Sequence, residues 1–329
     1  MFFTFSLKTA LKDPVELEVV GADGKTIRKL KAKGRVGMNR VKWDLRYDPP
    51  RLIALRTVAP DNVHIWQELR FRDEDSRPIT HWGTKPAEVG PIVTPGNYTV
   101  RLKIGDQTYT QPVSVVRDPR SPGSDADIDL SVKTQLRIRE DISGVSDRVN
   151  QMEWLRKQLE VIEVMLRPPK KKEKEKMPVA LPDEEEEESE AEQAPAFDDA
   201  QSKKRSEMLK TVEALDHKVQ AIEYKLVSPS LVNSDDKYYV EAYRAYLNLI
   251  WLNAEVGTGG GDVAGGADFT PTDTELDSLK TIEAEFASTT ADYQRLLNED
   301  LPAFNRFLAA NNVTAVLAAT VAPAQIKVE

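Results

Sequence analysis

The chain has no cysteine and only three histidines in 329 residues. Without cysteine there is no disulfide, no thiolate nucleophile and no zinc site built on cysteine ligands. The sequence also lacks an apolar run near the roughly 20 residues that cross a bilayer, so we expect no membrane span. The opening MFFTFSLKTALK has neither the basic start nor the small-residue cleavage site of a signal peptide, and it predicts a β-strand instead.

Clustered positive charge is also missing, although the two ends of the chain differ in sign. Residues 1–120 hold 21 Lys and Arg against 14 Asp and Glu, a net +7, so the other residues carry −16 of the overall −9. The basic side chains are scattered and form no stripe along one element. We therefore expect no nucleic-acid partner.

Apolar and polar residues alternate in the first 120 residues, which is typical of strands. The stretch VELEVVGADGKTIRKL has this alternation on both sides of the turn-forming GADGK and predicts a hairpin. NRVKWDLRY continues the pattern, and GNYTVRLKIGDQTYTQPVSVV predicts two strands joined at Gly105-Asp106. Short strands separated by turns favour an immunoglobulin-like β-sandwich over residues 1–120.

The spacing of apolar residues changes to three and four after RDPRSPGSD, which predicts helices. The first helix extends to Leu166, where prolines follow, and Asp125 or Asp127 is its expected N-cap. Three more stripes cover 208–226, 240–254 and 276–297. Because none of these helices can bury its stripe alone, we expect an antiparallel four-helix bundle over residues 121–310, followed by a tail at 311–329.

A charged segment interrupts this helical region at residues 168–200. It joins a lysine-rich block to the run DEEEEESEAE and has little to bury. Such a composition cannot offset the entropy of ordering, so we expect a disordered linker.

A long insertion at residues 48–92 interrupts the strand pattern and contains HIWQELRFRDEDSRPITHWGT. A connection of this length is expected to fold onto another part of the chain. Trp66, Phe71 and Trp82 would cap an open end of the sandwich in one interpretation. In the other, Trp66 and Trp82 form an exposed platform that stacks on a sugar ring or docks a partner domain.

The same insertion supplies every candidate site residue of the sequence. The candidate ligand or partner surface consists of His64, Trp66, Glu68, Arg70, Arg72, His81 and Trp82. His64, Glu68 and His81 lack the spacing of a metal site, and no set of residues has the pattern of a catalytic centre. We therefore expect no catalytic residue, no cofactor and no bound metal.

Three stretches carry a resemblance to a known family: GMNRVKWDLRYDPPR, DNVHIWQELRFRDEDSRPITHWG and TPGNYTVRLKIGDQTYTQPVSVVRDPR. They resemble the C-terminal part of bacterial proteins that begin with a sortilin-like (VPS10-type) β-propeller, many of them labelled BNR-repeat glycosyl hydrolases. The resemblance runs from about residue 5 to residue 120 and continues more loosely along the helices. It implies an immunoglobulin-like domain, similar to that of flagellar hook-capping proteins, followed by a helical region.

No stretch of the sequence resembles the propeller itself, where the resemblance would place any glycan-cleaving centre. No catalytic residue is therefore carried over to this chain. The resemblance implies an upstream propeller domain or a separate propeller chain as partner, and a periplasmic or secreted location. We expect the chain to be the C-terminal portion of a longer design.

Three functions remain open at this level. The leading prediction is a non-catalytic accessory region that supports domain packing or oligomerisation of such a protein. The alternatives are a carbohydrate-binding module using Trp66 and Trp82, and a part of a glycoside hydrolase whose catalytic propeller is missing, with Glu68 as a conceivable acid. The long stripe from Ile142 to Leu166 also predicts an uncovered apolar end on which a second copy of the chain would form a homodimer.

Overall fold

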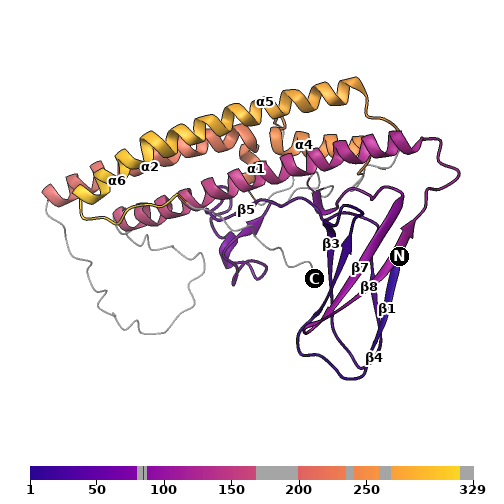
Figure 1. The fold of residues 1–329 in the computed structure, drawn as a ribbon. Coiled ribbons are helices and arrows are strands. Elements are labelled where there is room, and N and C mark those ends of the chain that lie inside the picture. The colour runs from indigo at the N-terminus through magenta and orange to yellow at the C-terminus, as the bar shows by residue number, and fades with distance from the viewer. Residues whose placement is uncertain (80–83, 85–86, 168–198, 235–240, 259–267, 319–329) are drawn as a thin grey trace, which may run out of the picture.

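The computed structural model describes residues 1–79, 84, 87–167, 199–234, 241–258 and 268–318. Strands dominate up to Val115 and helices dominate after Ser124, so the predicted order of β before α is confirmed. A row of long helices forms one layer of the molecule, and the strands project from one end of it (Figure 1).

Six of the strands form two antiparallel sheets that share one core, called here the β unit. The smaller sheet pairs β1 (Phe2–Leu7) with β4 (Gly37–Lys42). The larger has the order β3-β2-β7-β8, from β2 (Val15–Val20), β3 (Thr26–Ala32), β7 (Gly96–Ile104) and β8 (Gln107–Val115). The predicted hairpins at GADGK and at Gly105 are both present.

Trp43 is the centre of the core of the β unit. Its side chain is fully buried, with Phe3 stacked at 6.1 Å and Tyr98 edge-on at 5.9 Å between ring centroids. The indole N–H donates to the carbonyl of Arg46 at 3.0 Å, which satisfies the one polar atom of the ring. Alternating residues of both sheets complete this core.

The helices form a second region, the helical unit, with its own core. Its elements are α1 (Asp125–Leu166), α2 (Asp199–Leu226), α3 (Pro229–Asn233), α4 (Ala245–Asn253), η3 (Ala254–Thr258), α5 (Asp273–Arg295), η4 (Leu296–Asp300) and α6 (Leu301–Ala310). The C-terminal half of α1 packs against α2 and its N-terminal half against α4 and η3 (Figure 1). The α5–α6 segment packs against these helices and completes the layer.

Two details of the predicted helices are wrong. The N-cap of α1 is Ser124 rather than Asp125 or Asp127, because Ser124 and Asp127 form a reciprocal capping box. The third helix begins at Ala245 rather than at Val240, since Arg244 has an extended backbone. Val240 itself lies outside the described residues.

The C-terminal end of α1 exposes apolar residues, but they do not belong to the predicted stripe, which packs against the helical core as far as Leu166. Val161, Val164 and Met165 are 50 %, 69 % and 59 % exposed, whereas Leu155 and Leu159 are fully buried. Homodimerisation through this end stays a prediction.

The charged linker lies outside the described residues over 168–198, and Asp199 and Ala200 belong to α2. The predicted tail is divided in the same way. Val316 is buried in the helical core, and residues 319–329 lie outside the description.

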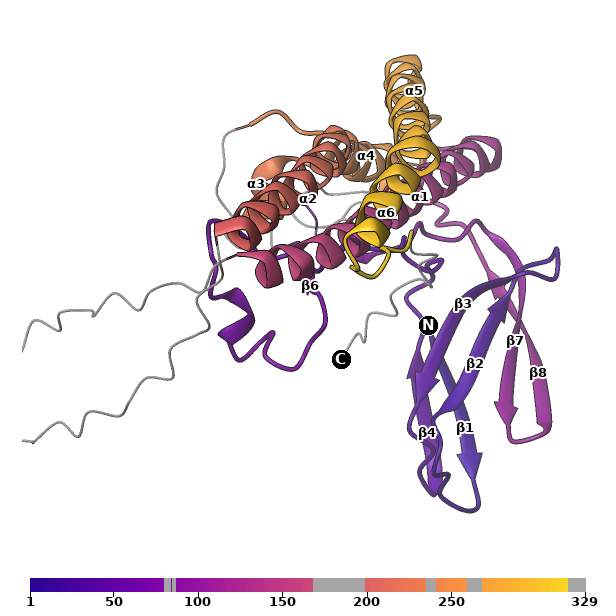
Figure 2. The same ribbon diagram turned by 90° about the vertical axis from the view of Figure 1, so that its left-hand side faces the viewer.

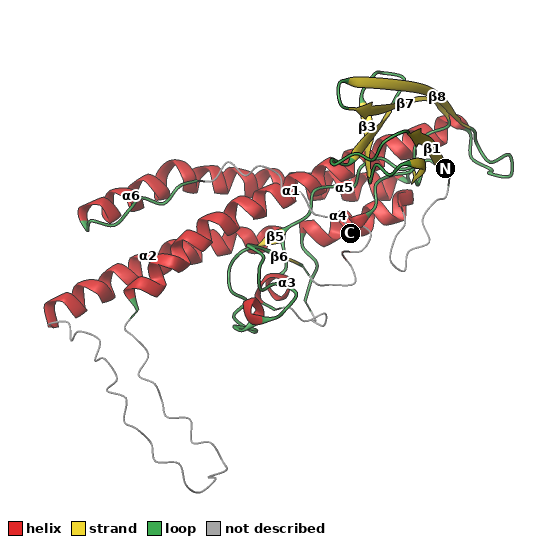
Figure 3. Cartoon of the chain, turned by 90° about the horizontal axis from the view of Figure 1, so that it is seen from below, coloured by secondary structure: helices red, strands yellow, loops and turns green. Residues whose placement is uncertain are grey.

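The insertion at residues 48–92, called the lobe, packs against the helices. Its short strands β5 (Ala54–Leu55) and β6 (Arg77–Pro78) pair with one another. The lobe residues Ile53, Leu55, Ile79 and Ala87 belong to the helical core. In Figure 3 the lobe lies beside the helices and α3, apart from β1, β7 and β8. The prediction that the aromatic insertion caps the sandwich is therefore wrong.

Candidate functional site

The base of the lobe is fixed to α1 by one buried carboxylate. Glu153 is fully buried and accepts hydrogen bonds from the backbone N–H groups of Arg56 and Thr57, the latter at 2.9 Å. The Thr57 hydroxyl donates to the second carboxylate oxygen at 2.9 Å. Because β5 ends just before these residues, the carboxylate takes up backbone donors that no strand satisfies.

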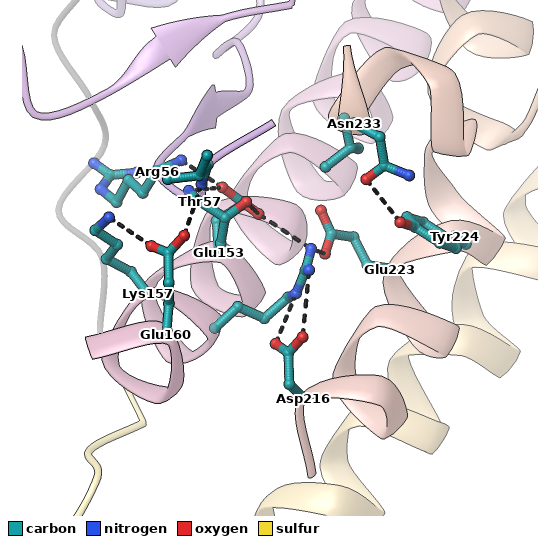
Figure 4. Close-up of polar contacts among 12 residues, drawn as sticks. Arg56, Thr57, Glu153, Lys157, Glu160, Asp216, Glu223, Tyr224 and Asn233 are labelled. Carbon is teal, nitrogen blue, oxygen red and sulfur yellow. Dashed lines mark hydrogen bonds and ion pairs between the residues drawn. The ribbon is translucent and has the colours of Figure 1, made fainter. Parts of the chain in front are cut away.

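The same carboxylate faces buried Arg156, which joins α1 to α2. Figure 4 labels the three carboxyl groups around it, those of Glu153, Asp216 and Glu223. Arg156 donates from Nη1 to Glu223 at 2.9 Å and from Nε to Asp216 at 2.9 Å, while Glu153 lies 3.5 Å from Nη1. Arg156 and Asp216 are 8 % and 18 % exposed at their side chains, and the two glutamates are not exposed at all. We call these four residues the buried charge cluster.

Three carboxyl groups around one guanidinium leave an excess of negative charge in a dry environment. Burial raises the pKa of Glu223 to about 8, and this outweighs the attraction of Arg156. Among the described residues Glu223 Oε1 has no hydrogen-bond partner, which fits a carboxyl group that retains its proton. The carboxylates in turn raise the pKa of Arg156 despite its burial, so the guanidinium stays charged.

Further contacts beside the cluster also attach the lobe to α1. Glu160 of α1 accepts from the backbone N–H of Val58 at 3.0 Å and from Lys157 Nζ at 2.6 Å. Arg56 stacks on Trp154, with 4.5 Å between its guanidinium carbon and the ring centroid. The lobe is thus attached to α1 by side chains on three turns of one helix.

The far side of the lobe is attached to α3. The backbone N–H of Asp61 donates to the carbonyl of Asn233 at 3.0 Å, and buried Arg77 donates to the carbonyl of Val232 at 2.5 Å. Tyr224 of α2 donates to the Asn233 side chain at 2.8 Å and holds α3 in place. The lobe is therefore bound to the helical unit at two places, α1 and α3.

The chemistry of this arrangement is structural. A substrate cannot reach Glu153 or Glu223, which are fully buried. Both oxygens of Glu153 and one oxygen of Glu223 accept hydrogen bonds from the chain itself. The described residues contain no group of three or more His, Asp or Glu side chains that could hold a metal ion. The cluster fixes the position of the lobe and supplies no reactive group to solvent.

The tip of the lobe contains five of the seven predicted surface residues. His64 precedes the short helix η1 (Ile65–Gln67) and is exposed. Trp66 is half-buried, its ring meeting Phe71 edge-on at 6.4 Å, and its indole nitrogen is buried. Trp66 therefore packs within the lobe and does not lie flat on the surface.

The charged residues of the tip are arranged around that aromatic pair. Glu68 forms an ion pair with Arg70 at 2.7 Å, and Arg70 lies over Phe71 at 4.6 Å. Arg72 is exposed and donates to the carbonyl of Gln67 at 3.3 Å. His81 and Trp82 lie outside the described residues, so the predicted platform of Trp66 with Trp82 stays a prediction.

Apolar side chains that the sequence analysis did not single out complete the tip. Leu69 is 83 % exposed and Val63 is 58 % exposed. Together with His64, Arg70 and Arg72 they form the tip surface, which is apolar at two positions and charged at its rim. Asp73, Glu74 and Asp75 are exposed next to Arg72, so the rim carries both signs of charge. Apolar side chains with a polar rim are typical of protein–protein contact regions.

The buried charge cluster was also missed at the level of sequence. The available signal was the position of Glu153 and Arg156, which lie between the stripe residues Met152, Leu155 and Leu159. A charged residue within the buried face of a helix requires a partner from another element.

No protein-family model, curated protein or solved structure matches the chain. None of the described helices is long and apolar enough to cross a membrane. The resemblance to sortilin-like proteins consequently rests on the quoted sequence stretches alone.

Proposed function

We propose that this chain is a non-catalytic accessory region that presents the tip surface of its lobe to a partner domain. The observation that supports this proposal is the attachment of the lobe to the helices. Buried Glu153 and the contacts to α3 fix the lobe to α1 and α3, so that its tip faces solvent in one position. Rigid presentation lowers the entropy that a docking surface loses on binding.

The partner in this proposal is a β-propeller, either in the same polypeptide or as a separate chain. The resemblance supplies this expectation, together with an immunoglobulin-like character for the β unit and a periplasmic or secreted location. The exposed Leu69 would enter an apolar recess of the propeller, with Arg70 and Arg72 at the wetter edge.

A binding measurement tests this function. A purified sortilin-like propeller domain is immobilised, and the full chain is passed over it as the native form, as Leu69→Asp and as Leu317→Asp. Leu317 is 70 % exposed on the segment that follows α6, outside the lobe, and serves as the matched control. We expect Leu69→Asp to weaken binding at least tenfold and Leu317→Asp to leave it unchanged.

Two results would contradict the proposal. One is equal binding by both variants. The other is turnover of aryl glycosides by the purified chain that Glu68→Gln abolishes, since this would establish a hydrolase centred on the lobe.

A further inference from the structure

The two sheets of the β unit are unequal in width. The β1–β4 sheet has two strands among the described residues, and the sheet it faces has four. Figure 2 shows the β7–β8 hairpin extending beyond the β1–β4 pair. The inner face of this hairpin is therefore only partly covered, and Tyr109 of β8 is 53 % exposed on it.

A groove of about 870 Å³ occupies the uncovered place. Apolar side chains from both sheets line it, including Phe3, Phe5, Leu102, Ile104, Tyr109 and Val113. In the registered β7–β8 pair, Tyr109 lies opposite Leu102, and Val113 lies opposite Tyr98. These residues share the face that carries the core of the β unit, so the groove continues that core to the surface.

The two strands that border the groove, β1 and β8, carry no charge, although Lys8 follows β1 at the end of the groove. Neither FFTFSL of β1 nor QTYTQPVSV of β8 contains a charged residue, whereas β3 contains three and β4 contains two. Exposed sheet edges are ordinarily protected by charged side chains. Among the described residues β1 pairs with β4 alone, so its other edge faces the groove without this protection.

We propose that the groove receives an extended segment of a partner polypeptide, which adds a third strand to the β1–β4 sheet by pairing with β1. The segment is about six residues long, since β1 spans six residues, or roughly 20 Å. It carries apolar side chains at alternate positions, facing Tyr109 and Leu102, and it is uncharged because both flanking strands are uncharged.

A second copy of the chain would bring a β1 that is already paired with β4, whereas the groove borders one free edge and takes a single strand. A second copy is therefore the alternative occupant that the experiment below distinguishes. The groove is also separate from the lobe, which belongs to the helical unit. Loss of one surface therefore leaves the other intact, and the two proposals fail independently.

The probe for this site is a fluorescein-labelled peptide of six alternating valine and threonine residues, compared with a peptide of the same composition in which the three valines come first. Fluorescence anisotropy is measured with the full chain as the native form, as Tyr109→Lys and as Ser114→Lys. Ser114 is exposed on the outer face of β8, does not line the groove and is the matched control.

We expect the alternating peptide to bind at least tenfold more tightly than the other. Tyr109→Lys should weaken it at least tenfold, and Ser114→Lys less than twofold, with unchanged circular dichroism in both variants. Equal binding of the two peptides, no binding to the native chain, or equal effects of the variants would overturn the proposal. A concentration-dependent dimer that Tyr109→Lys dissociates would also overturn it, by assigning the groove to a second copy.

Discussion

The β unit and the helical unit bury their apolar surface to different degrees. The helical unit places fully buried residues along the central half of α1, from Ile138 to Leu159. In the β unit only the part around Trp43 is closed, and Leu102, Ile104 and Val113 remain partly open along one side. The well-buried helical unit holds the lobe in place. The β unit keeps an apolar groove exposed to solvent, where a partner can bind.

The lobe belongs to the helical unit although its sequence interrupts the β region. Its backbone leaves the strands at Tyr47 and returns near Val93. Between these points its buried side chains join the helical core, and its polar backbone is satisfied by α1 and α3. By sequence order the lobe lies within the β region, whereas by packing it belongs to the helical unit.

The largest expected effect comes from removing the carboxylate that anchors the lobe. Glu153→Ala would leave Arg156 without one partner and the N–H groups of Arg56 and Thr57 without acceptors, in a dry environment. Breaking such a buried pair costs about 3–5 kcal/mol. We expect a loss of this size in urea unfolding followed by circular dichroism at 222 nm.

The control for this change is Glu213→Ala on α2, whose side chain is 37 % exposed and whose ion pair among the described residues is a long one, to Arg167 at 3.6 Å. Exposed ion pairs contribute about 0–1 kcal/mol. Equal losses for Glu153→Ala and Glu213→Ala would show that the cluster does not anchor the lobe.

A matched pair of leucine substitutions compares the two units directly. Leu155→Ala, at a fully buried site of α1, should cost about 3 kcal/mol. Leu102→Ala, at the partly open groove, should cost about 1 kcal/mol because its side chain is only partly removed from water. Urea unfolding of both variants measures the difference, and a larger cost for Leu102→Ala would reverse the comparison.

The smallest expected effect is a dependence of stability on pH. The pKa of Glu223 in the folded state is raised to about 8 from its ordinary 4.5, so the folded chain holds a proton that the unfolded chain has already lost. This contribution to stability is complete below about pH 4.5 and is lost as the pH rises through about 8. One such proton changes stability by at most about 1.4 kcal/mol per pH unit.

The useful window is pH 6.5 to 8, because Asp141, whose pKa burial raises to about 6, has largely ionised below it. The free energy of unfolding should fall across this window in the native chain, and the fall should be reduced in Glu223→Gln. An identical slope in both proteins would place the proton elsewhere.

Periodicity was sufficient to predict most of the elements. The alternation at Val15, Leu17 and Val19 and the stripes along α1, α2 and α5 depend on local spacing, which sequence displays directly. The error at the N-cap of α1 arose because Ser124 and Asp127 cap the helix together.

The position of the lobe was not predictable by the same means. Its anchors join residues that are far apart in the sequence, 96 positions for Thr57 with Glu153 and 155 positions for Arg77 with Val232. Nothing in the local pattern of HIWQELRF shows whether Phe71 packs on a strand, on a helix or on Trp66. Of the candidate surface, the exposure of His64 and Arg72 followed from polarity, whereas the inward packing of Trp66 required the fold.

The most direct test of the account is amide hydrogen exchange in Trp43→Ala, a variant expected to open the β unit because Trp43 fills the centre of its core. The account predicts that the amides of Ala54 and Thr57, bonded to Asn150 and Glu153, keep the slow exchange of α1 while those of Val19 and Val100 exchange rapidly. Loss of protection at Ala54 and Thr57 together with Val19 and Val100 would contradict the assignment of the lobe to the helical unit.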